Sequence, residues 1–146
     1  MKKYLLIFAF FLFLIGFYAY FKFDFNGDKN FSNSTEPLIC DLNIQDCTFE
    51  FKDKKIRVSL NPKPLQAMDV LDLKIENLDF YKNLSLKIYG LNMFMGEIKP
   101  KLIYENSYYK AKLVLSTCVL DTMRYRAQFF KDNKPLGFHF DFELKR

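Results

Sequence analysis

The chain has 146 residues, half of them hydrophobic, with 18 Phe and no Trp. With only five Gly and five Pro, it is neither collagen-like nor low-complexity, and its length allows one domain plus an appendage. The net charge of +5 is spread along the chain rather than gathered in a basic run. Binding to nucleic acid is therefore not expected.

The first element is an apolar segment at the N-terminus. Residues 4–21 carry no charge, and as a helix they would span roughly 27 Å, close to the hydrocarbon thickness of a bilayer. The end of the segment is bulky, from Gly16 to Phe21, which favours an uncleaved signal-anchor over residues 1–22 rather than a cleaved signal peptide. Lys2 and Lys3 would stay inside, so we expect a single pass through the inner membrane with the rest of the chain in the periplasm.

A polar stretch follows the anchor. Residues 23–38 are rich in Asn, Asp, Ser, Gly and Thr and show no periodicity, which predicts a flexible tether. Within it, Asn30 lies in an Asp-x-Asn-x-Ser pattern that resembles the extended acceptor site of bacterial oligosaccharyltransferases. Asn30 is therefore a candidate glycosylation site, although short patterns of this kind also arise by chance in Asn-rich chains.

Residues 39–146 show the alternation of apolar and polar residues that is typical of β-strands. Strands are expected over 47–52, 56–60, 71–76, 85–89, 98–104, 108–115, 124–129 and 138–144. Seven or eight short strands with polar turns and no convincing helix predict an all-β domain, an immunoglobulin-like β-sandwich. A small barrel is the alternative.

Three cysteines in an exported domain leave one without an intrachain partner. A Cys40–Cys47 disulfide would pin the tether to the first strand and leave Cys118 as a free thiol. The alternative, Cys47–Cys118, would join two strands across the sandwich and remove Cys118 from any ligand role. The sequence favours the first pairing but leaves both open.

Four sulfur-bearing residues form the candidate functional site. Met93 and Met95 lie two residues apart between glycines, and Cys118 and Met123 follow about 25 residues later. In an extended segment Met93 and Met95 would face the same way, with Phe94 turned inward. Thioether and thiolate sulfurs are soft ligands that select Cu(I), so the four residues are candidate copper ligands. The competing explanation is that Met93 and Met95 fill gaps in the core, as Met commonly does; Met68 is expected to cover the core.

Nothing in the sequence indicates an enzyme. The single histidine, His139, shares a strand face with Asp141 and Glu143 and is expected to be solvated. It would be an auxiliary ligand only if that face met the methionine segment. One histidine placed this way makes no catalytic triad, and the chain has no glycine-rich phosphate loop.

The segments YGLNMFMG (residues 89–96) and LSTCVLDTMRY (residues 115–125) resemble a group of small exported bacterial proteins with a Met-x-Met-Gly segment ahead of a Cys-(x)4-Met segment. The layout of one N-terminal span and an exported β-sandwich is similar to FixH/YtkA-like proteins. That resemblance implies copper handling in the assembly of haem–copper oxidases, with Met93, Met95, Cys118 and Met123 as the matching positions. The motif region has no His, unlike many copper carriers, which favours Cu(I) over Cu(II).

The sequence therefore predicts a membrane-anchored periplasmic protein that binds Cu(I) and delivers it to a membrane cuproenzyme such as a terminal oxidase. The alternative function is a structural or interaction module without a metal, which would scaffold a membrane or envelope complex through an exposed strand edge.

Overall fold

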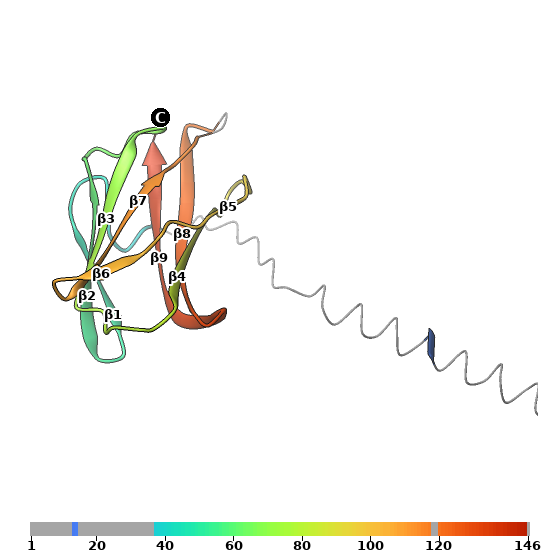
Figure 1. Cartoon of the computed structure of the whole chain (residues 1–146). Coiled ribbons are helices and arrows are strands. Elements are labelled where there is room, and N and C mark those ends of the chain that lie inside the picture. Colours follow the sequence, from blue (N-terminus) through green and yellow to red (C-terminus); the bar gives the residue numbers. More distant parts are fainter. Residues whose placement is uncertain (1–12, 15–36, 118–119, 146) are drawn as a thin grey trace, which may run out of the picture. The chain divides into compact units, whose positions relative to one another are not determined.

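The computed structural model describes residues 13–14, 37–117 and 120–145 (Figure 1). The chain divides into two units, residues 1–31 and 32–146, and the strands of the described residues all belong to the second. Most of the predicted anchor (1–22) and tether (23–38), including Asn30, lies outside the described residues. Within the described part, none of the helical structure has the length and apolar character that crossing a membrane requires.

The described strands form two antiparallel sheets, which is consistent with the predicted β-sandwich (Figure 1). One sheet has the order β1-β2-β3-β7-β6, and the other has the order β5-β4-β8-β9. Each sheet has two free edges, so the strands do not close into the barrel that was the alternative. The strands are β1 (Cys47–Phe51), β2 (Lys54–Asn61), β3 (Val70–Glu76), β4 (Leu84–Gly90), β5 (Glu97–Ile98), β6 (Ile103–Glu105), β7 (Tyr108–Val114), β8 (Thr122–Lys131) and β9 (Lys134–Lys145).

Three tight hairpins are built on the same turn chemistry. The two residues between the paired strands are Lys52-Asp53, Asn106-Ser107 and Asp132-Asn133, and all six have a positive φ. Two successive residues with positive φ match the right-handed twist of the flanking strands, and Asn and Asp tolerate this conformation well. Short polar pairs in the sequence therefore fix the register of three strand pairs.

The core lies between the two sheets and is rich in aromatic rings. In β9, Phe138, Phe140 and Phe142 alternate with exposed or half-exposed residues and are buried, as the period of two predicts. The ring of Phe140 stacks on that of Phe49 in β1, with centroids 5.4 Å apart, so this contact joins the sheets. Phe129 of β8 lies fully buried beside Phe138 and Phe140.

One predicted strand is wrong. Residues 98–104 do not form a single strand, because β5 ends at Ile98 and β6 begins at Ile103 in the other sheet. Pro100 lies between them, and proline cannot donate a hydrogen bond to a strand ladder. The chain uses this break to cross from one sheet to the other.

One end of the sandwich is here called the proximal end. By register it holds the start of β3 beside the end of β7, and the end of β4 beside the start of β8. The loops at this end are 62–69, 91–96 and 115–121, and the segment 37–46 ahead of β1 reaches it at Asn43, which hydrogen-bonds to Glu143 and Leu65. The C-terminus of β9 lies here too, at the top of Figure 1, and the hairpin turns 52–53, 106–107 and 132–133 lie at the distal end.

Candidate functional site

The loop 91–96 carries two of the predicted ligands and is tied to the first residues of β8. The backbone N–H of Leu91 donates to the carbonyl of Arg124 at 2.7 Å. The side chain of Asn92 continues this ladder, because its Nδ2 donates to the Thr122 carbonyl at 2.8 Å and its Oδ1 accepts from the Arg124 N–H at 3.1 Å. An amide side chain thus takes the place of a backbone partner and holds the loop against β8.

Asn92→Ala removes both of these hydrogen bonds, and we expect it to lower the free energy of unfolding by about 1–2 kcal/mol, since each such bond contributes roughly 1 kcal/mol. Urea unfolding of the wild type and the variant measures the change. Ser85→Ala, which removes an exposed hydrogen bond from the Ser85 hydroxyl to the Phe130 carbonyl at the distal end, is the matched control and should cost less. An equal loss in both variants would show that Asn92 does not hold the loop.

Gly90, the last residue of β4, brings Met93 and Met123 to one place. A Cβ at position 90 would lie 2.1 Å from the Met93 carbonyl oxygen and 3.1 Å from the Met123 methyl carbon. The loop therefore folds back over Gly90 so closely that no side chain fits there. Two of the four predicted ligand residues are neighbours of this glycine.

The predicted ligands differ in exposure. Met123 lies on the inward face of β8 and is completely buried, and Met93 is half-buried against the core. Met95 is 40% exposed. Phe94, which was predicted to turn inward, is 63% exposed, because the segment 91–96 is an irregular loop and does not alternate as a strand would. Leu91 is the residue of this loop that enters the core.

Cys118 and Val119 lie outside the described residues, but both ends of their loop are anchored at the proximal end. Leu115 is fully buried, and the Tyr125 hydroxyl donates a hydrogen bond to the carbonyl of Ser116. Burial raises the pKa of the Tyr125 hydroxyl, which stays a neutral donor. Sequence reasoning did not single out Tyr125, although its position early in β8 is where a tyrosine corner of a β-sandwich places such a residue.

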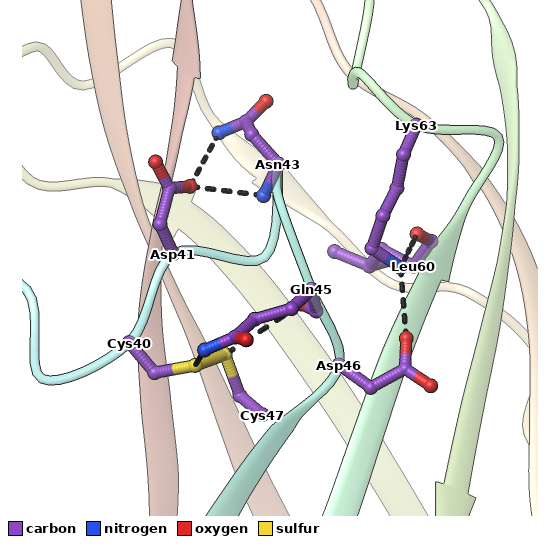
Figure 2. Close-up of a disulfide and its surroundings, with 8 residues drawn as sticks. All are labelled: Cys40, Asp41, Asn43, Gln45, Asp46, Cys47, Leu60 and Lys63. Carbon is purple, nitrogen blue, oxygen red and sulfur yellow. Dashed lines mark hydrogen bonds and ion pairs between the residues drawn. A yellow bond between two sulfur atoms is a disulfide. The ribbon is translucent and has the colours of Figure 1, made fainter.

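The structure joins Cys40 to Cys47, which is the pairing that the sequence favours (Figure 2). Cys47 is the first residue of β1 and is fully buried. Because this pair uses two of the three cysteines, Cys118 is left without an intrachain disulfide partner. Next to the bridge, Lys63 donates to Asp46 at 2.8 Å, and this hydrogen bond lowers the pKa of the Asp46 carboxyl.

Two groups of paired charges flank the loop 91–96. Arg124 and Glu143 form a largely buried ion pair between β8 and β9. At the start of β5, a hydrogen bond from Lys99 lowers the pKa of the Glu97 carboxyl, and Lys87 adds to the effect. Neither pair places an open carboxylate beside the methionines, so the donors that distinguish this loop are thioether sulfurs.

Two further residues complete the comparison with the sequence. Met68 was expected to cover the core but is 71% exposed in the linker before β3. Its backbone N–H donates to the Leu115 carbonyl at 2.8 Å, which fixes the backbone of the linker and leaves the side chain outside. His139 is exposed in the middle of β9, opposite Gln128 of β8, on the solvent face that was predicted for it.

The described residues contain no group of three or more His, Cys, Asp or Glu side chains that could hold a metal ion. A shallow groove on the outer face of the first sheet is lined by Lys74, Lys101, Lys110 and Lys112. Three of these lysines are paired, with Glu76, Glu105 and Asp72. The groove therefore lacks the concentrated positive charge that an anionic ligand would require.

Comparison of the chain with protein-family models, with curated proteins and with solved structures gave no match in any of the three. The functional argument therefore depends on the residues and their arrangement.

Proposed function

We propose that this protein is held at the inner membrane by residues 1–22, with an immunoglobulin-like domain in the periplasm that binds Cu(I) through Met93, Met95 and Cys118. The observation that carries the proposal is the distribution of the methionines. Of the five in the chain, the four that follow Met1 all lie at the proximal end of the domain. The loop that contains Cys118 closes at the same end.

The strand order supports the immunoglobulin-like assignment. Strands β2, β3, β7 and β6 correspond to the A-B-E-D sheet of that fold, and β4, β8 and β9 correspond to C, F and G. The hydrogen bond from Tyr125 to the Ser116 carbonyl takes the place of the tyrosine corner near the start of strand F. In this assignment β1 is an additional strand at the outer edge of the first sheet.

The donor set suits Cu(I). One thiolate and two thioethers are soft ligands, and soft ligands favour Cu(I) over harder ions. Met95 and Met93 come from a loop that Asn92 and Gly90 hold in place, so their sulfurs are carried on a fixed backbone. Met123 lies behind this loop and supports it by packing. Such a site would hold copper for transfer to a membrane cuproenzyme, with a terminal oxidase as the proposed recipient.

The second candidate function is a scaffold without a metal, in which an exposed strand edge or loop recruits a partner. The observation that favours it is the burial of Met123 and the half-burial of Met93, because packing alone accounts for both side chains. Copper binding requires the sulfur atoms of the methionines, whereas a scaffold requires only side chains of the same volume.

Titration of the full chain in detergent with Cu(I), against a competing chromophoric chelator and without oxygen, separates the two functions. We expect one tightly held Cu(I) per chain. Cys118→Ser and the double variant Met93→Leu/Met95→Leu should each weaken binding by more than about 100-fold, since the loss of outer-shell partners alone costs roughly 10–100-fold. Leu conserves the volume of Met, so the double variant should lose less than about 1.5 kcal/mol of stability.

Met68→Leu is the matched control, because Met68 is an exposed methionine of the same end that lies outside the proposed ligand set. Its affinity for Cu(I) should equal that of the wild type. If the double variant binds Cu(I) as tightly as the wild type, or if the wild type fails to compete with the chelator, the copper proposal is wrong and the scaffold remains.

A further inference from the structure

The exposed apolar side chains of the domain are concentrated at its proximal end. Among residues 37–117 and 120–145, ten large hydrophobic side chains are exposed; five of them lie at this end, and two more lie in the segment 37–46 that leads into β1. We call these seven the apolar rim: Ile39, Ile44, Met68, Val70, Phe94, Met95 and Val114. The other three, Phe80, Ile103 and Tyr104, lie in the distal turn 77–83 and on β6 at the edge of the first sheet.

The segment ahead of β1 supplies the most exposed members of the rim. Leu42 is fully buried, and the side chain of Asn43 donates to the Glu143 carbonyl and accepts from the Leu65 N–H, so the segment is held to the domain. On this fixed backbone Ile39 is 94% exposed and Ile44 is 76% exposed. Two isoleucine side chains are thus exposed to solvent on a segment whose backbone is fixed to the domain.

A second part of the rim lies where β3 and β7 meet. Val70 pairs directly with Val114, and both side chains are exposed on the outer face of the first sheet. Met68 is held beside them by the hydrogen bond to the Leu115 carbonyl. On the other side of the sandwich, the loop 91–96 adds Phe94 and Met95. Clustered exposed apolar groups of this kind mark a surface that binds another apolar body.

The place of the rim residues in the sequence indicates which apolar surface they contact. The domain begins with the segment 37–46, which carries Ile39 and Ile44, and the 16-residue tether separates the domain from the uncharged segment 4–21. A flexible linker of this length has a root-mean-square reach of roughly 20–25 Å. A bilayer that holds the segment 4–21 would therefore lie within reach of the rim, and the tether would raise the effective concentration of that surface to the millimolar range, about what a short flexible linker provides.

We propose that the apolar rim docks on the lipid bilayer into which the chain is anchored, with Ile39, Ile44 and Phe94 entering the boundary between headgroups and acyl chains. This proposal rests on the membrane anchor of the proposed function and not on its copper site. The charged residues at this end include both Asp69 and Lys145, so docking depends on apolar contact rather than on anionic lipid. Docking places the loop 91–96 at the membrane surface.

The test uses the full chain with Cys118→Ser, reconstituted in vesicles of neutral phosphatidylcholine. An environment-sensitive fluorophore is attached at Phe94→Cys in one preparation and at Lys82→Cys, in the distal turn 77–83, in another. We expect the fluorophore at position 94 to shift to shorter wavelength and to be quenched by quencher-labelled lipids. The fluorophore at position 82 should report water and escape quenching. Added salt should leave both signals unchanged.

Substitution within the rim gives the matched comparison. Ile39→Ser with Ile44→Ser should reduce lipid quenching at position 94, whereas Phe80→Ser with Ile103→Ser, two exposed apolar residues away from the rim, should not. All four side chains are exposed, so the domain should stay folded, and circular dichroism checks this. If the fluorophore at position 94 reports water, docking is wrong. If it is shielded from water without lipid quenching, a protein partner or a second copy covers the rim, and docking is also wrong.

Flotation of the vesicles after an alkaline wash distinguishes a failure of docking from a failure of the membrane anchor. Chains that float but show no quenching at position 94 keep the anchor and overturn docking. Chains that wash off overturn the anchor and the docking proposal together. Chains that float and are quenched support both.

Discussion

Phe129→Ala is expected to lower the free energy of unfolding by about 3–5 kcal/mol, which is the usual cost of deleting a fully buried Phe ring. Phe129 is completely buried in β8, and its ring centroid lies 5.1 Å from that of Phe138 and 6.2 Å from that of Phe140. Both neighbours belong to β9, so the cavity would open where β8 and β9 face the other sheet. Urea unfolding of the full chain in detergent, followed by circular dichroism, measures the loss.

The next residue in the chain provides the control. Phe130 is half-exposed on the outer face of β8, where the ammonium of Lys87 lies 4.6 Å from its ring centroid. Phe130→Ala removes the same side chain from the other face of the same strand and should cost only about 1 kcal/mol, the value of an exposed cation–π contact. Similar losses for the two variants would contradict the burial that the structure assigns to them.

Gly90→Ala is expected to have the second largest effect, because it acts on the fold and on the candidate site together. The added methyl group would lie 2.1 Å from the Met93 carbonyl oxygen, far inside van der Waals contact, so the loop 91–96 must move. Overpacking of this kind typically costs about 1–3 kcal/mol. We also expect weaker binding of Cu(I), since Met93 and Met95 move with the loop. Urea unfolding and chelator competition measure the two effects.

Gly96→Ala is the comparison at the other end of the loop. A Cβ there would meet no atom within 4 Å, and the cost comes from a φ of +94°, a conformation that L residues rarely adopt. Stability should fall through backbone strain while the position of Met93 is kept. A Gly90→Ala variant with the stability and copper affinity of the wild type would show that the loop does not fold over Gly90 as described.

Local patterns predicted most strands of this fold, because the alternation of apolar and polar residues is a short-range property. β9 alternates without interruption and was placed to within a few residues, and the Asp132-Asn133 turn follows from residues that accept a positive φ. The prediction of one strand over 98–104 was wrong because the two ends of this segment pair with different sheets, and strand pairing depends on the whole molecule. Contacts between distant residues, such as that of Asn92 with Arg124, leave no short-range pattern.

The candidate site was likewise only partly predictable from the sequence. The spacing of Met93 and Met95 in the sequence marks them as a pair, but only the pairing of β4 with β8 brings them near Met123. The predicted strand 124–129 left Met123 just outside its boundary. The observed strand begins at Thr122, so Met123 shares the inward face with Tyr125, Ala127 and Phe129, and its complete burial follows. An error of two residues at a strand boundary thus concealed the environment of one predicted ligand.

The disulfide between Cys40 and Cys47 determines how a mechanical load on the N-terminal chain reaches the domain. A pull transmitted through residue 40 passes through the covalent bridge directly to the first residue of β1. The six residues between the cysteines bear no tension, so the contacts of Leu42 and Asn43 stay in place under load. β1 pairs with β2 along its whole length, and the force is therefore shared by a strand ladder rather than by the segment that presents Ile44.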